Sequence, residues 1–263
     1  MSSHVEGAPA ADAVEGAAPA LSRGGTLIAA VRSVLAYGLL IAYVAVTAPP
    51  GLLLAWLFRW KGILYDLGHA GAAMALGLAG IRVVVTGREH VPRDRAVVFC
   101  ANHQSNVDPP VLFRVLHRRL HVLYKAELTK LPLLGWAFLL GGFVPVERHN
   151  REAAMAAIDR AAESLRAGNS FLIFPEGTRS RTRQLLPFKK GGFIMAIKAQ
   201  VPIVPVAIDG GRAAMRKGSR LVYPAEIRVR IGAPIETRGR TIDERDRLIG
   251  EVRGEIERLL DTA

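Results

Sequence analysis

A long stretch without any charged side chain, from Ser33 to Phe58, constrains the fold of this chain more than any other feature. It is longer than the ~20 residues that a helix needs to cross the hydrocarbon of a bilayer. Pro49-Pro50-Gly51 lies inside it, however, and a proline removes a backbone donor and clashes with the preceding helical turn. We therefore do not expect one straight membrane-spanning helix. A second apolar stretch, Gly62 to Ile81, carries Asp66 and His69 and has an amphipathic pattern.

Basic residues flank the uncharged stretch on both sides, with Arg23 and Arg32 before it and Arg59 and Lys61 after it. The positive-inside tendency places both flanks on the cytoplasmic side. A helix–turn–helix that dips into one leaflet satisfies this arrangement, and an ordinary pair of buried core helices is the alternative. We expect residues 26–80 to form a membrane-associated helical hairpin, monotopic or re-entrant, at the cytoplasmic face of the cell membrane.

The first residues of the chain predict a disordered tail. Residues 1–22 are mostly Ala, Gly, Ser and Pro, with the acidic residues Glu6, Asp12 and Glu15. A secretion signal has a basic start followed by an apolar run, and this segment has neither. Segments that are this poor in apolar side chains cannot bury enough surface to order the backbone. Disorder is therefore expected over residues 1–25.

Composition indicates a partner that is both apolar and anionic, because half of the residues are hydrophobic and the net charge is +12. Nucleic acid would suit the charge, but aromatic residues make up only 6% and no finger, homeodomain or ribonucleoprotein signature is present. Cys100 is the only cysteine, which excludes an intrachain disulfide and a cysteine metal cluster, and its apolar surroundings predict a buried strand residue. We expect a membrane lipid surface as the partner and no nucleic acid.

Over residues 81–263, short β-rich runs alternate with helical patterns. Glu152–Arg166, for example, places Ala154, Ile158 and Leu165 on one face, which is the spacing of a helix that packs on a sheet. Such alternation is typical of an α/β layered domain. The predicted strands are 82–86, 96–100, 121–124, 143–146, 171–174, 202–208 and 226–231, and the predicted helices are 110–116, 133–139, 152–166, 192–198 and one from 242 onward.

The first candidate site follows the predicted strand 96–100, where Asn102-His103-Gln104-Ser105 is followed by Asp108. Polar residues just past the carboxyl end of a strand occupy the usual active-site edge of an α/β sheet. His103 could take a proton from a hydroxyl, and Asp108 could orient its ring, provided that a turn between them brings the two together. Asp108 before Pro109 also fits a plain helix N-cap. Judged on the five-residue spacing between His103 and Asp108 alone, this structural alternative is favoured.

A second candidate segment follows the apolar strand Phe171–Phe174 and runs from Pro175 to Ser180. Gly177 permits a tight turn and a close approach of the backbone to a ligand. Arg179 offers a planar fork suited to bidentate phosphate contact, and Thr178 adds a hydroxyl donor. A solvated turn with surface arginines is the alternative.

Two further segments fit the same site. Val144–Arg148 ends a strand with a basic residue, so that Arg148 is either a second phosphate contact or a solvated strand end. Val201–Val206 is an apolar strand with two prolines. Because a proline cannot donate to a ladder, we expect an edge or irregular strand, either in the core or beside an acyl-chain groove.

Together these segments resemble the four ordered motifs of the lysophospholipid/glycerol-phosphate acyltransferase family, and most closely its bacterial 1-acyl-sn-glycerol-3-phosphate acyltransferases. Four motifs in the same order are far more specific than any one of them. The matching segments, within residues 80–235, are Asn102–Ser105 with Asp108, Val146–Arg148, Phe174–Arg179 and Val201–Val206, and Lys125–Leu128 looks like the family's intervening segment.

The resemblance implies an α/β fold, a three-layer αβα domain with a mixed sheet, preceded by a two-helix membrane-associated element. It makes His103 the general base and Asp108 its orienting partner. It also implies a set of residues that bind the phosphate or glycerol portion of the acceptor, without a metal. These residues are Arg148, Glu176, Gly177, Thr178, Arg179 and Lys125.

The reaction implied by the resemblance is transfer of a fatty acyl group to the sn-2 hydroxyl of 1-acylglycerol 3-phosphate (lysophosphatidic acid), giving phosphatidic acid in phospholipid biosynthesis. The co-substrate would be acyl-CoA or acyl carrier protein, and no cofactor is expected. An acyltransferase for another lysolipid or for glycerol 3-phosphate would share every motif. A membrane-bound thioesterase and a non-catalytic lipid-binding module also remain open.

Overall fold

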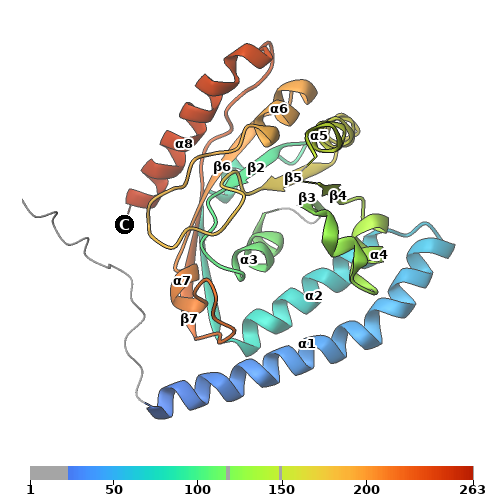
Figure 1. Cartoon of the computed structure of the whole chain (residues 1–263), viewed down its shortest axis with the longest axis vertical. Coiled ribbons are helices and arrows are strands. Elements are labelled where there is room, and N and C mark those ends of the chain that lie inside the picture. Colours follow the sequence, from blue (N-terminus) through green and yellow to red (C-terminus); the bar gives the residue numbers. More distant parts are fainter. Residues whose placement is uncertain (1–22, 117–118, 148–149, 263) are drawn as a thin grey trace, which may run out of the picture.

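Two helices at the start of the described chain form a hairpin along one side of an α/β domain (Figure 1). The computed structural model describes residues 23–116, 119–147 and 150–262. Helix α1 spans Arg23–Leu57 and helix α2 spans Gly62–Leu78. The helix begins before the predicted boundary at residue 26, and the rest of the predicted tail, residues 1–22, lies outside the described residues.

Helix α1 continues through Pro49 and Pro50, so these prolines do not end the helix, although it is not straight. A proline inside a helix loses one hydrogen bond and bends the axis without ending the helix when the surrounding packing holds it, and Figure 1 shows α1 bending toward its C-terminal end. Gly51 supports this packing, since a Cβ there would come within 2.5 Å of Leu67 Cδ1 on α2. The chain reverses later, at Arg59, whose φ of 52° is left-handed.

The α/β domain is built on a seven-stranded mixed sheet with the order β1-β7-β6-β2-β5-β3-β4. Only the β6–β7 pair is antiparallel, and every other neighbouring pair is parallel. The strands are β1 Ile81–Thr86, β2 Val98–Ala101, β3 Leu120–Lys125, β4 Val144–Val146, β5 Ser170–Ile173, β6 Ile203–Asp209 and β7 Ala225–Ile231. All of the predicted strands are present, with small shifts at their ends.

Helices cover both faces of the sheet, which confirms the three-layer αβα class. On one face, α5, α6 and α8 contribute Ala161, Phe193 and Val252 to a core shared with β2 and β5. On the other face, α2 and α3 contribute Leu76 and Leu112 to a second core. The helices of this domain are α3 Asp108–Val115, α4 Leu134–Leu140, α5 Arg151–Arg166, α6 Gly191–Ala199, α7 Gly211–Ala214 and α8 Arg245–Asp261, with 3₁₀ turns η1 Arg88–His90, η2 Ala126–Lys130 and η3 Ile242–Glu244.

The edge alternative for Val201–Val206 is wrong, because β6 lies inside the sheet between β2 and β7, whereas the core position and the irregular pairing are confirmed. Pro205 fits there for a local reason. Its carbonyl accepts a hydrogen bond from the Gly232 amide, and the amide and carbonyl of one strand residue point to the same side. On that side the ladder to β7 begins only at Val206, while Ile203 pairs with the segment after β7. The proline therefore lies where the ladder to β7 is interrupted, and its missing donor falls within that interruption.

Aromatic contacts join the hairpin to the α/β domain. The Tyr65 hydroxyl on α2 donates a hydrogen bond of 2.7 Å to the Gly141 carbonyl. Its ring stacks against that of His121 on β3, with 6.1 Å between ring centroids. His121 is buried, and this burial, together with the nearby Lys61 ammonium, lowers the pKa of the His121 imidazole to about 4.

We expect acid to destabilise the protein through His121. Its ordinary pKa is about 6.5, so between pH 6.5 and about 4 the unfolded chain binds a proton that the folded chain does not. Stability contributed by this group is thus present above pH 6.5 and is lost as the pH falls through that window. Urea unfolding of wild type and His121→Gln at several pH values measures the effect. The variant should show a shallower decline, and identical slopes would contradict this role of His121.

Candidate active site

His103 and Asp108 meet at the carboxyl end of β2. The His103 Nδ1 atom lies 2.9 Å from the Asp108 Oδ2 atom, and the aspartate is fully buried whereas 16% of the histidine side chain is exposed. The imidazole stacks on Phe174, with 4.2 Å between ring centroids. One ring nitrogen is therefore fixed by a carboxylate, which is the arrangement that a histidine general base requires.

A tight loop brings the pair together across five positions. The Asp108 Oδ2 atom also accepts hydrogen bonds from the backbone amides of Gln104 and Ser105, at 2.6 and 2.7 Å. Asp108 is the first residue of α3, but its carboxylate binds amides of the preceding loop and not those of the helix. The plain N-cap alternative is therefore wrong, and Asp108 organises the loop that carries His103.

Glu176, in the segment that follows β5, supports the same loop, whereas its predicted role as a substrate ligand stays a prediction. Its side chain is buried, and its two oxygens accept hydrogen bonds from the amides of His103, at 2.8 Å, and Leu186, at 2.9 Å. Burial raises the pKa of the Glu176 carboxyl, and these two amides oppose that shift. The Ser180 amide completes the link by donating to the His103 carbonyl at 2.8 Å. Glu176 is thus a positioning residue for His103.

The predicted basic turn after β5 lies next to His103. Gly177 has a φ of 67°, and a Cβ there would come within 2.7 Å of the Lys189 side chain, so glycine lets this lysine cross the turn. Thr178 is exposed and Arg179 is half-buried. The Lys217 Nζ atom donates to the Thr178 Oγ1 atom at 3.2 Å and to the Arg179 carbonyl at 2.9 Å. Lys217, which belongs to none of the sequence motifs, therefore lies against this turn.

Lys125 lies farther along the same edge of the sheet. The parallel strands β2, β5, β3 and β4 are neighbours in that order, so their carboxyl ends are aligned. Lys125 ends β3 as an exposed residue and pairs with Glu127 at 3.0 Å. Arg148 lies outside the described residues. Within the part of the chain that the structure describes, no cluster of His, Cys, Asp or Glu side chains is placed to hold a metal ion.

Gly211 packs directly against the His103–Asp108 pair, next to the Asp108 carboxylate. It follows β6, and a Cβ at this position would overlap the Asp108 Oδ1 atom and approach Ser105 Cβ to 3.1 Å. Gly211 belongs to none of the sequence motifs described above. Its signal was a glycine pair, Gly210-Gly211, just past the carboxyl end of a predicted strand, which is the same position relative to a strand that drew attention to His103.

We expect Gly211→Ala to lower kcat at least about tenfold, because the added methyl group displaces Asp108 and small displacements of catalytic groups are costly. Steady-state acyl transfer measures the effect, and thermal unfolding shows whether the fold is retained. Gly250→Ala on α8 is the matched control, since a Cβ there has nothing within 4 Å and should leave the rate unchanged. A wild-type rate in Gly211→Ala would show that the contact with Asp108 is unimportant.

Comparison with known proteins agrees with this site. Residues 82–209 match the family model described as Acyltransferase. A 1-acyl-sn-glycerol-3-phosphate acyltransferase from Cocos nucifera is 36% identical over 178 residues, which cover 67% of this chain and 56% of that protein. One from Limnanthes douglasii is 33% identical over 213 residues, covering 78% of this chain and 74% of that protein. The crystal structure of the 1-acyl-sn-glycerophosphate (LPA) acyltransferase PlsC from Thermotoga maritima matches with a TM-score of 0.75 at 27% identity, over 90% of this chain and 98% of that one.

The histidine–carboxylate pair at the edge of the sheet lies within the residues that match the Acyltransferase family model. This chain belongs to the acyltransferase family that includes the 1-acyl-sn-glycerol-3-phosphate acyltransferases, as the sequence motifs predicted. It spans a little over half of the Cocos nucifera relative and about three-quarters of the Limnanthes douglasii relative.

Proposed function

We propose that this protein transfers a fatty acyl group from an acyl thioester, either acyl-CoA or acyl carrier protein, to the sn-2 hydroxyl of 1-acylglycerol 3-phosphate, giving phosphatidic acid. The observation that carries the proposal is the His103–Asp108 pair, 2.9 Å apart, beside the basic turn at Arg179. The relatives from Cocos nucifera and Limnanthes douglasii, named for this acceptor, support the choice of substrate.

The chemistry follows from the orientation of His103. Because Nδ1 faces Asp108, the Nε2 atom is the one left to take the proton of the substrate hydroxyl as its oxygen attacks the thioester carbonyl. The tetrahedral intermediate then collapses, the C–S bond breaks, and the imidazolium returns its proton to the leaving thiolate. Asp108 stabilises the imidazolium between these two steps. The substrate hydroxyl acts directly, so no covalent acyl-enzyme is required.

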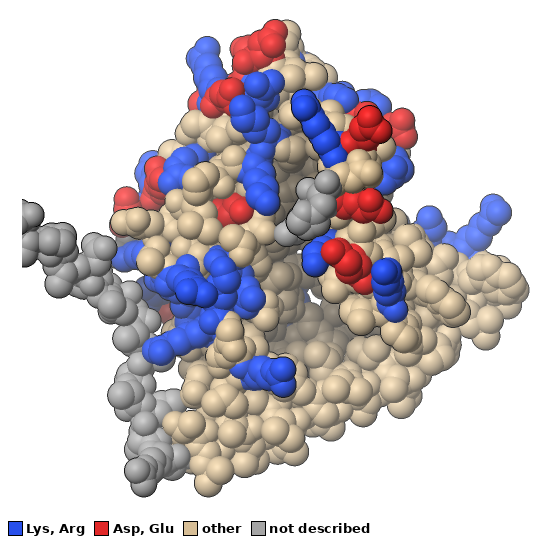
Figure 2. All heavy atoms as spheres, in the orientation of Figure 1, with Lys and Arg blue, Asp and Glu red and all other residues tan. Residues whose placement is uncertain are grey.

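Helix α1 supports a location at a membrane. Its segment Gly25–Leu57 is long and apolar enough to cross a bilayer, and only 17% of its most apolar window is buried. In Figure 2 the strip formed by α1 and α2 carries few charged side chains over most of its length, whereas Lys and Arg side chains gather on the domain above it. Insertion of the hairpin from the cytoplasmic face would place these cations against anionic headgroups, each contributing about 1 kcal/mol.

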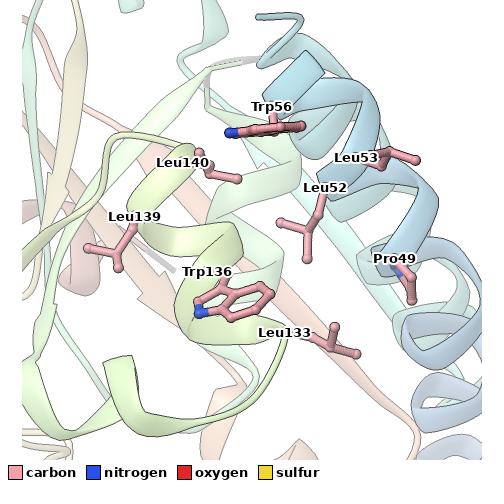
Figure 3. A pocket seen from close by; sticks show the side chains of 8 residues that line it. All are labelled: Pro49, Leu52, Leu53, Trp56, Leu133, Trp136, Leu139 and Leu140. Atoms are coloured by element: carbon pink, nitrogen blue, oxygen red, sulfur yellow. The ribbon is translucent and has the colours of Figure 1, made fainter. Parts of the chain in front are cut away.

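An apolar cavity between α1 and α4 continues the apolar surface of the helical hairpin onto the α/β domain. It has a volume of about 600 Å³, and Figure 3 shows side chains from both helices facing it. Trp56 and Trp136 contribute to it and are 68% and 66% exposed. Exposed tryptophans are typical of the boundary between lipid and water. The lining residues are Pro49, Leu52, Leu53, Trp56, Leu133, Trp136, Leu139 and Leu140.

A thiol-release assay on the purified protein tests the proposed function. It should be run with acyl-CoA and with acyl carrier protein, each combined with 1-acylglycerol 3-phosphate, lysophosphatidylcholine, glycerol 3-phosphate or no acceptor. We expect release that depends on 1-acylglycerol 3-phosphate, with phosphatidic acid formed in equal amount. Equal release without any acceptor would identify a thioesterase, and dependence on another acceptor would reassign the substrate.

A further inference from the structure

The segment that follows β6 wraps around the catalytic pair, although it lies about 100 positions away from His103 along the chain. Gly211, the first residue of α7, contacts Asp108 and Ser105. Farther along, the Met215 carbonyl accepts a hydrogen bond of 2.7 Å from the Ser105 hydroxyl. Contacts at these two points fix the position of the residues between and beside them.

Arg212 lies directly after the glycine that contacts Asp108, and it is half-buried. Its charged neighbours are Asp209 and Arg183, and the Arg183 guanidinium is itself 4.0 Å from the Asp209 carboxylate. One carboxylate therefore lies near two guanidiniums. Burial lowers the pKa of the Arg212 guanidinium, Arg183 lowers it further, and Asp209 opposes both. The local excess of positive charge is unfavourable unless an anion neutralises it.

Lys217, five positions after Arg212 in the same segment, adds a second cation, which lies beside the turn that carries Arg179. It is half-buried, and its hydrogen bonds go to the Thr178 hydroxyl and the Arg179 carbonyl, which are neutral acceptors. Among the residues that the structure describes, no acidic side chain forms a salt bridge with Lys217 or Arg212. Figure 2 shows Lys and Arg side chains gathered around the position of α7.

We propose that Arg212 and Lys217 form, together with Arg179, a binding site for a phosphate monoester beside the His103–Asp108 pair. The proposal rests on the proposed function and deepens it, because it assigns the phosphate of the acceptor to residues outside the sequence motifs. Both the acceptor headgroup and the 3′-phosphate of CoA carry this chemistry. The acceptor is favoured by distance, since its phosphate is attached to the carbon next to the one that bears the reacting hydroxyl. The 3′-phosphate of CoA, in contrast, is separated from the thioester by the whole pantetheine arm.

Steady-state kinetics of Arg212→Gln and Lys217→Gln test the site. We expect the KM for 1-acylglycerol 3-phosphate to rise about tenfold or more in each variant, because a hydrogen bond to a charged group contributes about 1.5–3 kcal/mol. The KM for acyl-CoA should change less than about twofold, and slow transfer to monoacylglycerol, which has no phosphate, should be unaffected. Arg238→Gln is the matched control. Arg238 is exposed, and it follows the segment that pairs with Ile203, at the opposite end of β6.

Other outcomes overturn the proposal. A raised KM for acyl-CoA alone would assign the site to the donor, and unchanged constants for both substrates would remove its role. Equal loss with both acceptors would show that the residues only support the fold. If the wild-type protein does not use 1-acylglycerol 3-phosphate at all, the proposed function fails. Thermal stabilisation of wild type, but not of Arg212→Gln, by this lysolipid would still support the phosphate site, and equal stabilisation of the two proteins would refute it.

Discussion

Replacement of His103 by alanine is expected to lower the rate of acyl transfer by about 10³-fold, within the 10²–10⁴-fold range that general base catalysis contributes. The side chain lies at the surface of the site, in contact with Phe174 and Asp108. Its loss removes the base but leaves Asp108 bonded to the amides of Gln104 and Ser105. The loop should therefore keep its conformation, and thermal unfolding and vesicle binding should resemble those of wild type.

Thiol release and phosphatidic acid formation, measured together, provide the readout. His90→Ala is the matched control, because His90 follows β1, whose carboxyl end lies at the opposite edge of the sheet, and its ring binds the Ile231 carbonyl. The control should keep wild-type turnover. Turnover close to wild type in His103→Ala would rule out this histidine as the base.

Replacement of Glu176 by alanine is expected to affect both stability and rate. Two buried backbone amides, those of His103 and Leu186, would lose their acceptor. Each unsatisfied donor costs about 1–3 kcal/mol, so we expect the free energy of unfolding to fall by about 2–4 kcal/mol after the gain from removing a buried carboxylate. The rate should fall more than about 100-fold, because the loop that positions His103 loses its support. Urea unfolding and steady-state kinetics measure the two effects.

The variants of Glu176 also separate positioning from substrate binding. Glu176→Gln keeps one acceptor oxygen but turns an NH₂ group toward the other amide, so its losses should be intermediate. Glu236→Ala, at an exposed carboxylate paired with Arg95, should change neither quantity. If Glu176→Ala keeps wild-type stability and only raises the KM for the acceptor, the glutamate contacts substrate directly and our assignment is wrong.

Much of the fold could be predicted from local pattern, because the strands are short β-rich runs and helices such as α5 and α8 carry their apolar residues on one face. The place of a strand in the sheet could not. Pro205 suggested a strand at the edge of the sheet. Only the structure shows that the pairing of β6 with β7 is interrupted on the side where Pro205 lacks a backbone N–H. In the same way, Pro49 and Pro50 suggested a break in α1, but the packing of α2 against Gly51 holds the helix together.

The catalytic pair could be predicted because His103 and Asp108 are close in sequence and follow a strand. The role of Glu176 could not, because a motif indicates which residue is present and not whether its carboxylate is buried against backbone amides. Lys217 and Gly211 were missed for a different reason. Their contacts with Arg179 and Asp108 join distant parts of the chain, and although the glycine pair Gly210-Gly211 marked a strand end, a single sequence does not show which residues it contacts.

The first half of α1 is tied to the loop that follows Lys217. The Ser33 hydroxyl accepts a hydrogen bond of 2.8 Å from the Val222 amide, and the Tyr37 hydroxyl donates to the Arg220 carbonyl at 3.0 Å. The proposed lipid-binding helix and the proposed phosphate site are therefore connected through these two hydrogen bonds. A shortened protein that begins after α1, made to improve solubility, would release this loop, and crystallographic or inhibitor studies are better served by keeping the helix and supplying a detergent or nanodisc.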